Sequence, residues 1–359
     1  MPQELSSLHT SNIARAHRGN HQSPSTSAKL SKSKQGKDSS QGKTYTVKSK
    51  DRIRHQRGHD DRIGGCQLRS RYFIFGLGGG ADLFARTLIK IAQDEKLVPT
   101  NMIATNKPGG GTATGVGYVV ASKNKDPHTL VLINPQTLIT PLRVAGTFGA
   151  KNLTPIMNFM LDDYLLAVKA SSPYKSVNDV VAAAKAKPRT VTVGSAGTAD
   201  DMAVAILEQG TGGTKFNMVR FNSGGEALTA LLGGHVEAVA GNPIELNSQL
   251  QAKTIRALGV FRATRFAILP DVPTLQEQGI TVAPFQMWRG VAMPKEAPKE
   301  AAAYWQDVFT KIARTPAFKA YIATNVATEN LLPSQAFNDF LAQQESLYRA
   351  MLVSIEANK

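Results

Sequence analysis

From residue 72 onward, short apolar runs alternate with longer stretches in which apolar residues recur every three or four positions. The short runs are rich in aromatic and β-branched side chains and predict buried strands, whereas the longer stretches predict amphipathic helices. The predicted strands cover 72–75, 102–105, 129–133, 165–168, 191–193, 216–221, 236–240, 255–260 and 285–293. The predicted helices cover 82–94, 114–122, 177–186, a stretch from 198, 226–232, 299–315, 316–324 and 334–354.

This alternation of strands and helices predicts the α/β class. Strands that alternate with helices form a parallel sheet with helices on both faces. Ligands of such sheets bind beyond the carboxyl ends of the strands, where the chain turns into the next helix. We therefore expect a binding site at the turns that follow the predicted strands.

Residues 1–71 have a different composition from the rest of the chain. They are polar and rich in Ser, Lys, Arg and His, a composition that buries too little apolar surface to offset the entropy of ordering. The first 72 residues hold fifteen of the 42 Lys and Arg against five of the 27 Asp and Glu, so most of the net charge of +15 belongs to them. We interpret 1–71 as a disordered basic N-terminal extension. The alternative is a basic arm for nucleic acid or acidic lipid, but we expect no nucleic-acid partner.

A glycine-rich turn lies between the first predicted strand and the first predicted helix, in the stretch YFIFGLGGGADLFAR. Such a turn presents unpaired N–H groups and the positive end of a helix dipole, and glycine lets a ligand approach the main chain, so the turn predicts an anion site. Gly76, Gly78 and Ala81 also match the dinucleotide fingerprint G-x-G-x-x-A. However, the next strand is followed by Asn106 rather than by the acid that holds a ribose in that fingerprint.

Four further polar or glycine-rich turns follow later predicted strands. None of the five turns contains Arg or Lys, so main-chain N–H groups, hydroxyls and amides would hold the anion, each neutral donor contributing about 0.5–1.5 kcal/mol. We expect Asp82 to be the N-cap of its helix. The candidate ligand-binding residues are Gly78, Gly79, Gly80, Ala81, Asp82, Asn134, Gln136, Thr137, Ser195, Ala196, Gly197, Asn222, Ser223, Gly224, Gly225 and Asn242.

The sequence contains no recognisable catalytic or metal-binding pattern. Ser195 directly follows Gly194, so the nucleophile motif G-x-S-x-G is not matched. Only His128 and His235 fall after residue 72, and with the single cysteine, Cys66, they do not make a zinc site. No apolar run of about eighteen residues predicts a transmembrane span. We therefore expect no enzymatic activity, no metal and no cofactor.

Five longer segments carry a resemblance to a known family: GGGADLFAR, NKPGGGTATGVGYVVA, VGSAGTADD, FNSGGEALTALLGGHVEAV and LPDVPTLQEQG. In order and spacing they resemble the tripartite tricarboxylate transporter substrate-binding proteins, the TctC-like or Bug family of extracytoplasmic solute receptors. The resemblance extends from residue 72 to the C-terminus.

The resemblance implies a two-domain periplasmic-binding-protein type II fold, each domain a mainly parallel sheet flanked by helices, with the ligand cleft between them. It places residues 72–168 and 287–359 in domain 1 and residues 169–286 in domain 2. It also implies a monomeric periplasmic receptor that captures a small organic carboxylate for the membrane components of a tripartite tricarboxylate-type transporter. The chain shows no recognisable signal peptide.

Two other functions stay open on the sequence alone. The same fold occurs as the ligand-sensing effector of transcription regulators, although residues 1–71 lack the apolar helical periodicity of a helix-turn-helix. A nucleotide-dependent oxidoreductase could be built on the turn at Gly76, but the missing acid after strand 102–105 counts against it.

Overall fold

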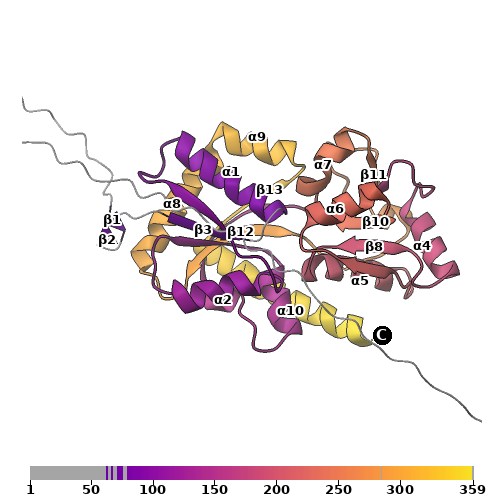
Figure 1. The fold of residues 1–359 in the computed structure, drawn as a ribbon, viewed down its shortest axis with the longest axis horizontal. Coiled ribbons are helices and arrows are strands. Elements are labelled where there is room, and N and C mark those ends of the chain that lie inside the picture. Colours follow the sequence, from indigo (N-terminus) through magenta and orange to yellow (C-terminus); the bar gives the residue numbers. More distant parts are fainter. Residues whose placement is uncertain (1–61, 64–65, 68–70, 76–78, 284, 358–359) are drawn as a thin grey trace, which may run out of the picture. The chain divides into compact units, whose positions relative to one another are not determined.

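The computed structural model describes residues 62–63, 66–67, 71–75, 79–283 and 285–357. Figure 1 shows their helices and strands, and these described residues belong to one compact unit. The predicted disorder of 1–71 falls mostly outside the described residues. Within them the prediction is too broad, because β1 (Arg62–Ile63) pairs antiparallel with β2 (Cys66–Gln67), and β3 (Arg71–Phe75) already begins at Arg71.

The first of two large sheets has six strands in the order β13-β6-β12-β5-β3-β4. Besides β3, its strands are β4 (Met102–Asn106), β5 (Thr129–Ile133), β6 (Leu153–Leu161), β12 (Trp288–Pro294) and β13 (Thr328–Pro333). β3 pairs parallel with β4 and β5. β12 pairs antiparallel with β5 and β6, and β13 pairs antiparallel with β6.

The second large sheet has five strands in the order β11-β7-β10-β8-β9. They are β7 (Leu165–Lys169), β8 (Thr192–Ser195), β9 (Asn217–Arg220), β10 (Ala238–Gly241) and β11 (Ile255–Val260). β8 pairs parallel with β9 and β10, whereas β7 pairs antiparallel with β10 and β11. Most strands of each sheet therefore run in the same direction, as expected, and a minority run antiparallel to them. The antiparallel strands β7 and β12 enter their sheets directly from the other sheet, and no intervening α-helix imposes the parallel direction.

The chain passes from the first sheet to the second and later returns. The first passage spans only 162–164, between β6 and β7, and the return follows β11 and ends at β12. Strand 165–168, which we assigned to domain 1, hydrogen-bonds to β10 and β11 in the second sheet. The predicted passage near Val168 is therefore misplaced by a few residues, because a strand pattern does not show which sheet the strand joins.

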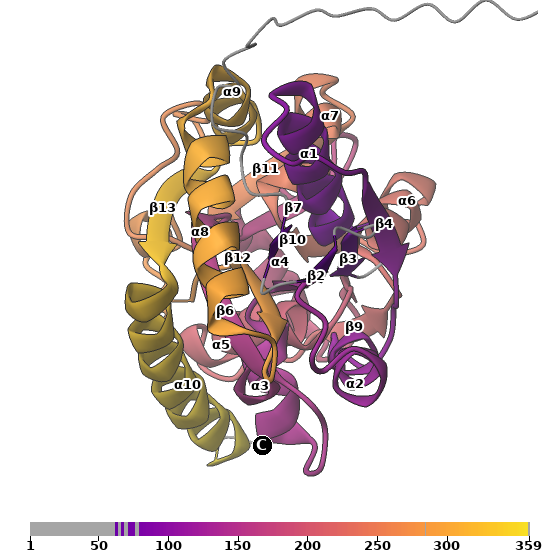
Figure 2. The same ribbon diagram turned by 90° about the vertical axis from the view of Figure 1, so that its left-hand side faces the viewer.

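Helices cover both faces of each sheet (Figure 2). The first sheet carries α1 (Gly80–Asp94), α2 (Ala113–Ser122), α3 (Gln136–Arg143), α8 (Lys299–Arg314), α9 (Pro316–Thr324) and α10 (Ser334–Ala357). The second carries α4 (Val177–Ala186), α5 (Thr198–Gly210), α6 (Gly224–Gly233) and α7 (Pro243–Gln251). Two short 3₁₀ turns, Ala150–Asn152 and Gln276–Gln278, complete the described elements. No helix in these residues is both long and apolar enough to cross a membrane.

Strand β5 shows how the sequence builds two hydrophobic layers around the first sheet. Leu130 and Leu132 pack in one core cluster with side chains of α1, α8 and α9. Val131 and Ile133 point to the opposite face and pack with side chains of α2, α3 and α10. Because successive strand residues face opposite sides, a continuous apolar run is what a strand covered on both faces requires.

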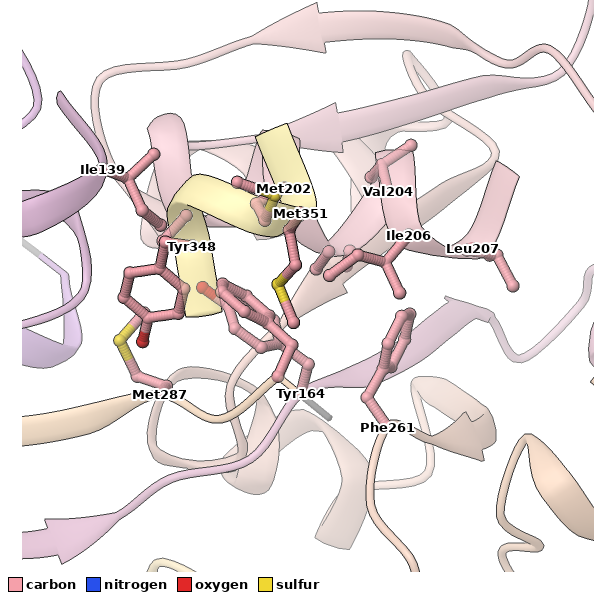
Figure 3. Close-up of a cluster of buried hydrophobic side chains, with 14 of the residues drawn as sticks. Ile139, Tyr164, Met202, Val204, Ile206, Leu207, Phe261, Met287, Tyr348 and Met351 are labelled. Carbon is pink, nitrogen blue, oxygen red and sulfur yellow. The ribbon is translucent and has the colours of Figure 1, made fainter. Parts of the chain in front are cut away.

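The cluster that contains Val131 also extends across to the second sheet. Figure 3 shows Tyr164 and Met287, from the two passages between the sheets, close to Tyr348 and Met351 of α10 and to Met202 of α5. Helix α10 packs against β6, β13, α3 and α5, so it contacts elements of both sheets. The two sheets therefore share one hydrophobic core at the passages between them.

Candidate functional site

A cavity of about 530 Å³ lies where the turns after the strands of both sheets meet, and we refer to it as the central pocket. The first sheet contributes residues 79–81 and 107–112, together with parts of β5 and β12 and the turn after β5. The second sheet contributes residues that follow β8, β9 and β10. The volume is suited to a small organic molecule.

Eleven of the candidate residues line the central pocket: Gly79, Gly80, Ala81, Asn134, Gln136, Ala196, Gly197, Asn222, Ser223, Gly224 and Asn242. Four others, Asp82, Thr137, Ser195 and Gly225, do not line it. Gly78 lies outside the described residues. The rule that glycine and polar turns after strands form the site thus places most of the described candidates in the wall, but it finds fewer than half of the lining residues and does not tell which side chain of a turn points inward.

Asp82 is not the N-cap that we expected. Helix α1 begins at Gly80 with Gly79 as its cap, and Asp82 lies in the first turn. Its Oδ1 accepts hydrogen bonds from Arg86 Nε at 2.9 Å and from Asn106 Nδ2 at 3.2 Å. The carboxylate therefore ties α1 to the end of β4 and is directed away from the pocket wall.

Ser195 and Thr137 are buried and make their hydrogen bonds within the protein. Ser195 Oγ donates to Asp201 Oδ1 at 2.6 Å, and Thr137 Oγ1 donates to the carbonyl of Asn134 at 2.5 Å. Asn134 Oδ1 in turn accepts the N–H of Gln136 at 3.0 Å. These contacts shape the turns at the pocket without presenting the two hydroxyls to it.

The two sheets approach each other closely at Gly197. A Cβ on Gly197 would lie 2.6 Å from Nε2 of Gln136, and its φ of +152° disfavours other residues. Next to this contact, Thr140 Oγ1 and Thr198 Oγ1 are 3.0 Å apart, and Arg143 Nη1 lies 3.3 Å from Asp201 Oδ2. Helices α3 and α5 thus close one side of the pocket.

The turn after β4 was not among our candidate residues, yet residues 107–112 line the pocket. Gly109, Gly110, Gly111 and Thr112 all have positive φ, of 115°, 57°, 54° and 73°. Left-handed backbone over consecutive residues strongly favours glycine, so the run of three glycines was itself a usable signal. At its start, Lys107 Nζ lies 4.6 Å from the ring centroid of Tyr118.

Charged side chains also line the pocket, although none of the five predicted turns contains Arg or Lys. Arg289 lies in β12 and donates from Nε and Nη2 to Asp162 Oδ2, at 3.0 and 2.5 Å. Burial raises the pKa of Asp162 to about 6, and the guanidinium opposes that rise, so the pair is ionised at neutral pH. Burial lowers the pKa of Arg289, but the carboxylates of Asp162 and Glu245 outweigh it and hold that pKa above its usual range.

Three acidic residues of the second sheet line the pocket: Asp200, Glu226 and Glu245. Asp200, in the first turn of α5, accepts hydrogen bonds from Tyr164 Oη at 3.0 Å and from the N–H of Ala196 at 2.8 Å. Burial, and then the nearby charge of Glu245, raise the pKa of Asp200 to about 7. Glu245, in the first turn of α7, accepts the N–H of Gly80 at 2.5 Å. No group of three or more His, Cys, Asp or Glu side chains suited to a metal gathers anywhere in the described residues.

The two sheets, the double passage between them and the pocket between their strand ends define a two-domain solute-binding protein of the periplasmic-binding type. The chain belongs to the family described as "Tripartite tricarboxylate transporter family receptor", which matches residues 85–356. Among curated relatives, the UPF0065 protein in the gbd 5' region of Cupriavidus necator is 29% identical over 280 residues, which cover 77% of this chain and 83% of that one.

Solved structures show the same fold. A TctC solute-binding protein from Polaromonas, solved without ligand, is 26% identical, covers 79% of this chain and 98% of its own, and has a TM-score of 0.58. MatC from Rhodopseudomonas palustris, solved with bound malate, is 18% identical with a TM-score of 0.72 and covers 79% and 99% of the two chains. An R. palustris protein solved with adipate is 20% identical with a TM-score of 0.72 and covers 80% and 97%.

Proposed function

We propose that the central pocket captures a small organic carboxylate and that the protein, a periplasmic monomer, presents this solute to the membrane components of a tripartite tricarboxylate-type transporter. Membership of the receptor family supports this function. So do the bound malate and adipate of two proteins that share the fold. The family match and the relatives give no support to a transcription regulator or to a nucleotide-dependent oxidoreductase.

One observation carries the proposal: six helices begin at the central pocket. The wall includes the N-cap or first residue of α1, α2, α3, α5, α6 and α7, contributed by Gly80, Thr112, Gln136, Gly197, Gly224 and Asn242. A helix start presents N–H groups without intrahelical partners and about half a unit of positive charge. Several such starts around one cavity favour an anion, and each neutral donor contributes about 0.5–1.5 kcal/mol.

We propose further that each sheet with its helices acts as one domain and that the domains close on the solute. The contacts of α3 with α5, through Thr140 with Thr198 and Arg143 with Asp201, would form on closure and break on opening. Polar contacts of this kind at a domain interface are compatible with reversible hinge motion.

Calorimetric titration with malate, succinate, glutarate and adipate tests the function. We expect at least one to bind, and a variant that fills the cavity, Ala196→Phe, to abolish that binding. Ala182→Phe, an equal change on the exposed face of α4, serves as the control for folding and should bind like the parent. Binding that survives Ala196→Phe in a folded protein would show that the solute site lies elsewhere.

A further inference from the structure

The two walls of the central pocket differ in charge. The starts of α2 and α3, on the side of the first sheet, carry no acid in their first turn, and Lys107 lies beside them. The starts of α5, α6 and α7, on the side of the second sheet, each carry an acid that lines the pocket: Asp200, Glu226 and Glu245. Arg289 balances these acids only in part, because it is paired with Asp162 and its single charge also acts on Glu245.

Glu245 occupies a position where a solute carboxylate could otherwise bind. Its Oε1 accepts the N–H of Gly80 at the start of α1, and a Cβ on Gly79 would lie 3.1 Å from the same oxygen. A Cβ on Gly224, at the start of α6, would overlap its Oε2. The carboxylate therefore lies in the space that Gly79 and Gly224 leave open between two helix starts, so the anion site of α1 is filled by the protein itself.

The other groups that line the pocket favour a carboxylate on one side and a cation on the other. The glycine turn 109–111 and Lys107 provide N–H groups and a positive charge for a carboxylate. Asp200 and Glu245 lie close enough for the charge of one to act on the other, and no pocket-lining cation on the second-sheet side offsets them. Two carboxylates close together in a partly buried site favour a cation between them.

We propose that the solute carries an ammonium group besides its carboxylate, and that Glu245 with Asp200 receives the ammonium while the turn 109–111 and Lys107 receive the carboxylate. This inference rests on the proposed function and narrows its substrate class. Glu245 is then the residue that determines specificity, because it excludes a second carboxylate from the start of α1 and offers acceptors to a donor.

Matched solutes test the assignment. Calorimetry on the full chain measures the affinities for succinate, glutarate and adipate. Each dicarboxylate is compared with two related compounds: one in which an aminomethyl group replaces one carboxylate, and the α-amino derivative. We expect an ammonium-bearing compound to bind best. Glu245→Gln keeps the shape of the side chain. It should weaken the affinity for that compound about ten- to a hundredfold, the range for a hydrogen bond to a charged group, while the affinity for dicarboxylates stays unchanged or rises. Asp200→Asn should also weaken the affinity for the ammonium-bearing compound.

Glu300→Gln removes the same charge from the first turn of α8, away from the pocket, and should bind like the parent. Equal thermal unfolding of the three variants and the parent excludes misfolding as the cause. If dicarboxylates bind tighter than every ammonium-bearing match and Glu245→Gln leaves that order unchanged, the inference is overturned while the proposed function stands. If no carboxylate of either kind binds, the proposed function fails and the inference with it.

Discussion

Arg289 donates two hydrogen bonds to one oxygen of Asp162, and the two side chains are only 2% and 0% exposed. The pair joins β12, where the chain re-enters the first sheet, to the segment 162–164, where it leaves that sheet. Asn242 Nδ2, in the turn before α7, donates to the carbonyl of Asp162 at 2.6 Å. One ion pair therefore links both passages between the sheets and one wall of the pocket.

Replacement of Arg289 by methionine should destabilise the protein by about 3–5 kcal/mol, because it leaves the carboxylate of Asp162 buried without its partner. The double variant Arg289→Met with Asp162→Asn should regain part of that loss, since no unpaired charge is left. Urea unfolding of the parent, both single variants and the double variant measures the coupling. Equal stability of Arg289→Met and the parent would mean that the pair contributes nothing.

Gly80 and Gly79 offer a matched pair of substitutions at the start of α1. A Cβ on Gly80 would overlap Arg289 Nη2 and lie 2.7 Å from Ile244 Cγ2, both in packed surroundings, whereas a Cβ on Gly79 meets only Glu245 Oε1, at 3.1 Å. We expect Gly80→Ala to lose about 1–3 kcal/mol of stability through overpacking and Gly79→Ala to lose less than about 1 kcal/mol. Thermal unfolding compares them, and similar losses for both variants would contradict the packing around Gly80.

Ser195→Ala should lower stability and leave solute affinity unchanged. The hydroxyl is buried and donates to Asp201, so its removal should cost about 1 kcal/mol. Asp201 keeps its contacts with Arg143 and Arg220, which limits the loss. This expectation replaces the one from sequence, in which Ser195 touched the solute. Calorimetry measures the solute affinity of this variant, and urea unfolding measures its stability. A weaker solute affinity at unchanged stability would restore the sequence-based role.

The strands and most helices could be predicted because local periodicity determines them. Two helices at the pocket were missed. Helix α3 contains Pro141, which usually ends a helix, and α7 begins with Pro243, a residue typical of turns although it also suits the first helical position. Strand β6 was missed because Pro155 is unusual inside a sheet, and the register of β6 with β12 shifts there.

The charged part of the site could not be predicted from local patterns. Glu245 meets Gly80 across 165 residues, and Arg289 meets Asp162 across 127. Only the paired sheets bring these positions together, so the sequence showed an arginine in an apolar strand and an acid after a turn, without a partner for either. The glycine turns could be predicted because positive φ and close approach depend on the residue itself.

Asp200 should make the stability of the protein depend on pH. Burial raises its pKa in the folded protein to about 7, well above the value of about 3.9 for an exposed aspartate. Between these values the folded state keeps a proton that the unfolded state releases. The contribution of Asp200 to stability is therefore fully present below about pH 4 and is lost as the pH rises through 7. Asp162 and Asp163, both raised to about 6 by burial, act in the same direction.

Asp200→Asn removes the titrating group and can keep both hydrogen bonds, since its amide accepts from Ala196 and donates to Tyr164. We expect the free energy of unfolding of the parent to fall between pH 5 and pH 8 by more than that of the variant, with a difference on the order of a few kcal/mol. The variant should thus be the more stable protein at pH 8. Asp307→Asn, at an exposed site on α8, should follow the parent at every pH, and urea unfolding across the range compares the three. The same pH dependence in the parent and in Asp200→Asn would show that Asp200 is ionised throughout, and that its environment in the pocket is more polar than its burial indicates.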